Sequence, residues 1–200
     1  LAPGKDGVMW VGTNSGGLAR YNPDTENFKV FQHDPDDPTS INQGRIYSLH
    51  IGGDGNLWAG TLGGGLNRYL PEKEGFISYT RDTSRENTLT SNNIYAIAHD
   101  SRDNLWIRTE KDLNLYRPES QTFQSFQVPG EKLVFEQTNS MFMDDQDMLW
   151  LAYPGGIMKF NTRSRESTLI EEPEFKNNTI TSICRHKKGQ LWIGSYNGLY

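Results

Sequence analysis

The stretch GNLWAGTLGGGLNRYLPEKEGFISY, residues 55–79, decides the fold, because parts of it recur along the chain. Its LWAGT core returns as MWVGT, LWIRT, LWLAY and LWIGS. Each copy carries one tryptophan at the same place: Trp10, Trp58, Trp106, Trp150 and Trp192. These positions are 48, 48, 44 and 42 residues apart. A period of about 40–50 residues with one Trp per unit is typical of a β-propeller, in which every repeat forms one four-stranded blade.

The second repeat shows how a blade is built. Alternating apolar residues, separated by glycine-rich or charged breaks, predict strands at 46–51, 57–61, 66–69 and 76–81. The breaks GGDGN and LGGG are typical of hairpin turns. We therefore expect an all-β fold over residues 1–200. It would be a partial β-propeller of antiparallel blades, three of them complete and two partial, within a ring for which we expect seven blades.

Composition limits the partners of the chain. It carries 20 Lys and Arg against 25 Asp and Glu, a net charge of −5, and no basic stripe that could neutralise phosphates. We therefore expect no nucleic-acid partner. No stretch approaches the roughly 18 apolar residues of a membrane-spanning helix, so a membrane would be reached only through a parent protein. The open edges of partial blades predict self-association.

Longer stretches resemble a known family. They are MWVGTNSGGLARYNPDTENFKVF (9–31), FQHDPDDPTSINQGRIYSL (31–49) and LWIGSYNGLY (191–200), together with the stretch quoted first. All are similar to the two-component regulator propeller repeat, and the resemblance covers the whole chain. It implies a periplasmic sensor domain of a bacterial membrane receptor, whose other domains would include a histidine kinase or a diguanylate cyclase.

The sequence offers no catalytic or metal-binding motif. Its histidines stand at unlike places of the repeat, without zinc-ligand spacing: His33, His50, His99 and His186. The acidic segments 34–37 and 144–147 could hold Ca²⁺, but Asp in a turn more often bonds its own backbone. The single Cys184 lies on a predicted strand, where we expect a small buried residue. We predict no catalytic residue, no metal and no cofactor.

The connections between repeats, at 32–44 and 80–92, indicate the binding face. In a four-stranded meander they emerge at the same end of a blade as the turn between its second and third strands. Functional residues tend to lie on long loops held by a rigid scaffold. The predicted ligand-binding residues break the repeat in or beside that turn: Arg108, Glu110, Lys111 and Tyr153. Arg108 could pair with an acidic group and Tyr153 could stack on a sugar ring.

Three functions remain open. The first, which the resemblance favours, is a sensor that binds a small molecule or an oligosaccharide and contacts other domains of its receptor. The second is a scaffold that holds protein partners. The third is an enzyme similar to the streptogramin lyases, which would need a histidine and acidic residues gathered at one face of the ring.

Overall fold

The computed structural model describes residues 1–127, 140–153, 155–176, 178–185 and 190–200. These residues form two compact units. The first unit comprises Leu1–His99 and Asp103–Phe126, and the second comprises Asp100–Arg102 and Gln127–Tyr200. Within the described residues, no helix is long and apolar enough to span a membrane.

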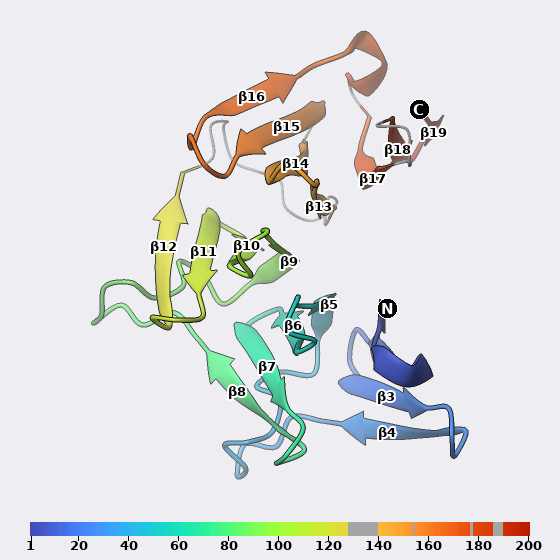
Figure 1. Cartoon of the computed structure of the whole chain (residues 1–200), viewed down its shortest axis with the longest axis vertical. Helices are drawn as coiled ribbons and strands as arrows, with labels where there is room; N and C mark the ends of the chain where they lie inside the picture. Colours follow the sequence, from blue (N-terminus) through green and yellow to red (C-terminus); the bar gives the residue numbers. More distant parts are fainter. Residues whose placement is uncertain (128–139, 154, 177, 186–189) are drawn as a thin grey trace. The chain divides into compact units, whose positions relative to one another are not determined.

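The first unit contains three antiparallel sheets of four strands, each in sequential order (Figure 1). The first sheet is β1 (Ala2–Pro3), β2 (Met9–Gly12), β3 (Leu18–Asn22) and β4 (Asn27–Phe31), with a 3₁₀ turn at Lys5–Gly7. The second is β5 (Ile46–Ile51), β6 (Leu57–Thr61), β7 (Leu66–Leu70) and β8 (Gly75–Tyr79). The third is β9 (Ile94–His99), β10 (Leu105–Thr109), β11 (Leu113–Arg117) and β12 (Thr122–Phe126). The first strands of the second and third sheets, β5 and β9, lie side by side.

The second unit contains two sheets. One is β13 (Met141–Met143), β14 (Met148–Tyr153), β15 (Gly156–Asn161) and β16 (Ser167–Ile170). The other has three strands, β17 (Ile180–Arg185), β18 (Leu191–Ser195) and β19 (Gly198–Leu199), and follows a 3₁₀ turn at Pro173–Phe175. All described strand pairs in both units are antiparallel, as blades of a propeller require.

The all-β propeller architecture is confirmed, and the second repeat forms its four strands within two residues of the predicted ends. The expected number of complete blades was too low. Four sheets have four strands, because Ala2 and Pro3 pair with Trp10 and Met9 and so supply a first strand to the first sheet. A two-residue strand beside a 3₁₀ turn leaves no alternating pattern that the sequence could reveal.

The threonine of the LWAGT motif closes the turn between the second and third strands. Thr61 Oγ1 donates to the carbonyl of Gly65 at 2.9 Å, and Gly65 has a φ of +74°, a conformation that favours glycine. The equivalent bonds join Thr13 to Gly17, Thr109 to Asp112 and Ser195 to Gly198. The recurring motif therefore encodes this turn as well as the strand before it.

The tryptophans of the first unit join neighbouring sheets. Trp10 is 5% exposed, and its ring centroid lies 4.8 Å from that of Tyr69 in the next sheet. Trp58 is 2% exposed and lies 5.4 Å from Tyr116 in the sheet after it. Arg20 covers the Trp10 ring at 5.8 Å and donates to Tyr69 Oη at 2.8 Å. Burial of two aromatic rings in each of these contacts stabilises the joint between sheets.

The motif tryptophan is not buried in every repeat. Trp106 is fully buried and Trp150 is half-buried, but Trp192 is 43% exposed. Cys184 on β17 is also exposed, so the expectation of a buried thiol was wrong. Cys184 and Trp192 are partners across β17 and β18 and point to the same face of their sheet.

Candidate functional site

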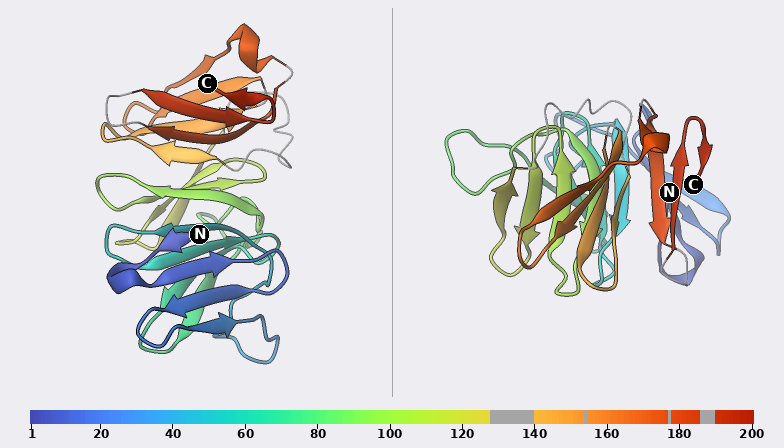
Figure 2. Two further views of the ribbon diagram at one scale, coloured as in Figure 1. Left: turned by 90° about the vertical axis from the view of Figure 1, so that its right-hand side faces the viewer. Right: turned by 90° about the horizontal axis from the view of Figure 1, so that it is seen from above.

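The long connections between sheets are fixed at both ends. In the connection 32–45, the Thr39 carbonyl accepts a hydrogen bond from Phe76 N at 2.7 Å, on the outer strand β8. The Arg45 carbonyl accepts one from Leu62 N at 3.1 Å, in the turn between the second and third strands. The connection 80–93 repeats both bonds, from Phe123 N to Asn87 O at 3.0 Å and from Glu110 N to Asn93 O at 3.1 Å. Figure 2 shows this second connection as the long green loop after β8.

A buried amide holds the middle of each connection. Asn67 is fully buried on β7, and its Oδ1 accepts from Asn42 N at 3.0 Å and from Ser78 Oγ at 2.7 Å. Asn114 on β11 is also fully buried, and its Oδ1 accepts a hydrogen bond from Thr90 N at 3.2 Å in the next connection. Both side chains place a polar partner where the connection passes over the sheet.

The acidic turns bond their own backbone. Asp34 Oδ1 accepts from Asp36 N at 2.9 Å, and Asp37 Oδ1 accepts from the hydroxyl and N–H of Thr39. These two bonds lower the pKa of Asp37. At the other acidic segment, Asp144 Oδ1 accepts from Gln146 N at 2.9 Å. No group of three or more His, Cys, Asp and Glu residues in the described parts of the chain is arranged to hold a metal ion.

Three cavities border the connections between sheets. The outer cavity of the first unit, about 500 Å³, lies between residues 31–41 and the side chains of Lys73, Glu74 and Phe76. The inner cavity of the first unit, about 390 Å³, is lined by Asn14, Ser15, Gln43, Gly44, Arg45 and Leu62. The cavity of the second unit, about 850 Å³, is lined by Gly155, Glu171, Glu172, Pro173, Lys176, Asn178 and Thr179.

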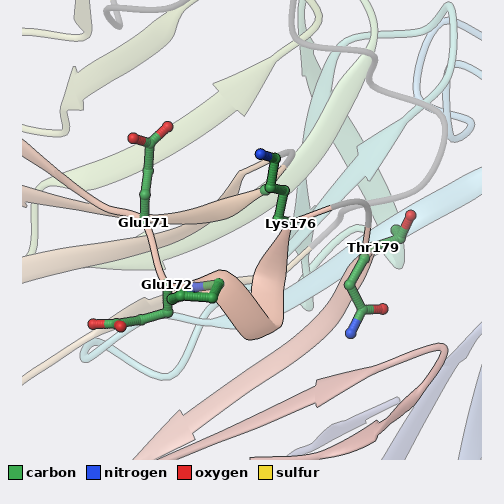
Figure 3. A pocket seen from close by; sticks show the side chains of 7 residues that line it. Glu171, Glu172, Lys176 and Thr179 are labelled. Carbon is green, nitrogen blue, oxygen red and sulfur yellow. The ribbon is translucent and has the colours of Figure 1, made fainter.

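The cavity of the second unit carries charges of both signs on the connection from β16 to β17 (Figure 3). Glu171 and Lys176 extend in the same direction, whereas Glu172 points elsewhere. Asn178, which also lines this cavity, is 6% exposed and donates to Ser195 Oγ at 2.9 Å. The Oδ1 atom of Asn178 is buried without a hydrogen-bond partner among the described residues. The cavity therefore offers donors and acceptors to a polar ligand.

Arg108 lies inside the first unit. It is 2% exposed on β10, and this burial lowers the pKa of its guanidinium to about 10, although Tyr95 partly opposes the shift. Its place in the repeat is that of Gly60, where an added Cβ would lie 2.5 Å from Ile94 Cγ2 in the next sheet. The residue equivalent to Ile94 for Arg108 is Thr138, which falls outside the described residues, as does His186.

The other three predicted ligand-binding residues lie at different places. Glu110 and Lys111 are exposed in the turn between β10 and β11, and Glu110 Oε2 accepts from Asn93 Nδ2 at 2.9 Å. Tyr153 belongs to the second unit, where it is 9% exposed at the end of β14 and pairs with Gly156. Glu110 and Lys111 thus share one turn of the first unit, whereas Arg108 is buried on the strand before it. The binding role of all four residues stays a prediction.

Two histidines form a pair that the repeat pattern did not reveal. His50 on β5 and His99 on β9 are offset by one position in the repeat, yet His50 Nε2 lies 2.7 Å from His99 Nδ1. Burial, and then the neighbouring His99, lower the pKa of His50 to about 4. The pair lies toward the ends of β5 and β9, whereas the inner cavity lies before the start of β5.

Two segments of the chain match a known protein family. Residues 88–111 and 174–197 match the family model described as two component regulator propeller. These two segments are similar to two-component regulator propeller repeats. The matched segments contain the connection ends, the motif tryptophans Trp106 and Trp192 and the turns described above. The resemblance drawn from the motifs is therefore confirmed. No curated protein matches the chain.

Solved structures share the fold. The extracellular domain of BT3049 from B. thetaiotaomicron, named as a hybrid two component system, is 23% identical with a TM-score of 0.78, over 96% of this chain and 25% of that one. The extracellular domain of BT4673 from the same organism, named as a one component system, is 25% identical with a TM-score of 0.74, over 96% and 24%. The chain thus resembles these extracellular domains in fold, and it spans about a quarter of their length.

A lyase shares the fold as well. Virginiamycin B lyase from Staphylococcus aureus is 18% identical with a TM-score of 0.76, over 98% of this chain and 62% of the lyase. At this identity the likeness concerns the fold alone.

Proposed function

We propose that this chain is a ligand-sensing propeller of a bacterial receptor, located in the periplasm, and that it acts by binding without catalysis. Its matched repeat segments and the extracellular domains that share its fold support this assignment. The observation that carries the proposal is the position of the cavities. All three border connections between sheets, which hydrogen bonds to the next sheet hold in place in the first unit.

A small molecule or an oligosaccharide is the ligand class that these cavities suit. Their linings combine amides, hydroxyls and charged side chains, which can hydrogen-bond a polar ligand in several directions. The enzyme alternative needs a histidine at the same face. The paired His50 and His99 lie toward the other ends of their strands, away from the inner cavity. His33 does line the outer cavity, where its Nδ1 lies 3.0 Å from the Ile41 carbonyl oxygen, so the enzyme alternative is decided by whether a bound saccharide is cleaved.

The remaining surfaces suit contacts within a receptor. We infer that the blades belong to a seven-bladed ring and that the face around Trp192 packs against another blade, of this ring or of a second copy. Trp192 is 43% exposed where Trp10 and Trp58 are covered by a tyrosine of the next sheet. Sedimentation velocity should show self-association that weakens in Trp192→Ser. A wild-type chain that stays monomeric at high concentration would argue against a second copy.

The sensor function is tested by titration calorimetry of the chain against neutral, acidic and amino oligosaccharides. We expect one class to bind and to raise the unfolding temperature, with the saccharide recovered unchanged. Glu171→Gln and Thr179→Val probe the second-unit cavity, and Asp54→Asn, an exposed change in the turn before β6, serves as a control. Cleavage of a bound saccharide would instead support the enzyme, and binding of protein domains alone would support the scaffold.

A further inference from the structure

The inner cavity of the first unit contains an unpaired positive charge. Arg45 is exposed there at the end of the connection 32–45, and within the described residues its guanidinium has no ion pair or hydrogen bond. No carboxylate lines this cavity, whose other polar side chains are Asn14, Ser15 and Gln43. In a chain of net charge −5 this is a local positive charge, which attracts anions.

The backbone around Arg45 is fixed on two sides. Its carbonyl accepts from Leu62 N at 3.1 Å, and the next residue, Ile46, donates its N–H to the Thr13 carbonyl at 2.9 Å. Gln43 Oε1 accepts from Gly44 N at 2.8 Å, which leaves the Nε2 of Gln43 as the donor that this side chain can offer. The donors of the cavity therefore project from a held segment.

The third sheet has the same arrangement with a carboxylate already in it. Asn93 occupies the repeat position of Arg45, and Ser91 that of Gln43. Both donate to one carboxylate oxygen, Glu110 Oε2, at 2.9 Å from Asn93 Nδ2 and 3.3 Å from Ser91 Oγ. Glu110 stands at the repeat position of Leu62. The N–H of Glu110 donates to the Asn93 carbonyl, as the N–H of Leu62 donates to the Arg45 carbonyl. The third sheet thus supplies its own acid to these donors.

The second sheet keeps the donors and lacks the acid. Arg45 and Gln43 replace Asn93 and Ser91, and Leu62 stands where Glu110 supplies its carboxylate. We propose that the inner cavity binds the carboxylate of a ligand, in the place that Glu110 fills in the next repeat. Arg45 pairs with the carboxylate through its planar fork, and Gln43 donates beside it. This assignment rests on the proposed sensor function, because it names the chemical group of the ligand that the inner cavity would bind.

The test uses galacturonate and its uncharged counterpart galactose, which differ only in the carboxylate. Each is titrated at millimolar concentration into the ¹⁵N-labelled chain, and amide shifts are followed by NMR. We expect galacturonate to move the amides of Ser15, Gln43 and Arg45, and galactose to leave them unchanged. Arg45→Ala should weaken this binding about tenfold or more, as the loss of a charge-assisted pair does, while Arg85→Ala, an exposed arginine of the next connection, should not.

A second variant tests the comparison between repeats. Leu62→Glu should place an internal carboxylate beside Arg45 and abolish galacturonate binding, as Glu110 does for its own sheet. Shifts of equal size with galactose, shifts confined to another cavity, or full binding in both Arg45→Ala and Leu62→Glu would overturn the assignment. Absence of any galacturonate response overturns it too, and leaves the sensor function standing if another saccharide binds elsewhere. Failure of every saccharide at every site would instead overturn the sensor function.

Discussion

The imidazoles of His50 and His99 meet across two neighbouring sheets, with 2.7 Å between His50 Nε2 and His99 Nδ1. One ring must be the donor and the other the acceptor, so the contact requires at least one neutral imidazole. Protonation of both rings would place two positive charges side by side in a partly buried site.

This pair predicts a loss of stability in mild acid. The pKa of His50 is lowered to about 4 by burial and then by His99, whereas an unfolded histidine titrates near pH 6.5. Between pH 6.5 and 4 the unfolded chain therefore binds a proton at His50 that the folded chain does not bind. The free energy of unfolding should fall as the pH is lowered through this range, by roughly 3 kcal/mol at most. Urea unfolding at several pH values should show a flatter profile for His50→Gln. Parallel profiles for variant and wild type would contradict this.

Trp58→Ala should destabilise the first unit by about 3–5 kcal/mol, because it removes a buried ring that packs against Tyr116. Trp192→Ala should cost about 1 kcal/mol, since that ring is 43% exposed. Chemical denaturation of the two variants makes the comparison. Equal losses would mean that exposure does not separate the two tryptophans.

Asn67→Ala should loosen the connection 32–45 before it unfolds the sheet. The substitution leaves Asn42 N without its acceptor and should cost about 1–3 kcal/mol. Hydrogen exchange at Asn42 should accelerate more than exchange in β6. Ser78→Ala, which removes only a donor to the same oxygen, is the matched control and should have a smaller effect.

Asp147→Asn should destabilise the second unit by about 1–3 kcal/mol. Burial would raise the pKa of Asp147, but hydrogen bonds from Ser101 and the charge of Arg163 outweigh it and lower the pKa. Its contribution is therefore present above the unfolded value near 3.9 and is lost as the pH falls below it. Asparagine suits the φ of 59° at this residue. Asp145→Asn, at an exposed carboxylate, is the control in thermal unfolding and should change little.

The features that recur in every blade could be predicted, because the same sequence pattern appears in each repeat. Thr61 and Trp58 recur at one place, so their strand and turn could be recognised without a structure. Features formed between repeats were harder to see. His50 and His99 are offset by one position in the repeat, and a one-residue offset hides a contact that depends on the twist between two first strands.

The candidate site shows the same division. The connections could be identified as long loops, but not the two hydrogen bonds that fix each of them to the next sheet. Glu110 drew attention because it departs from the repeat, yet its carboxylate is held by Asn93 of the same sheet. Arg45 was not identified from the sequence, because its suitability for binding an anion depends on which side chains line the same cavity.

The attachment of the connection 32–45 to both Leu62 and Phe76 has a consequence for the kinetics of recognition. A loop that had to fold around its ligand would slow the encounter and lose conformational entropy on binding. A connection held at its inner and outer ends should change little on binding, so association should approach the rate of simple docking. Selectivity among ligands would then be expressed mainly in how long each one stays.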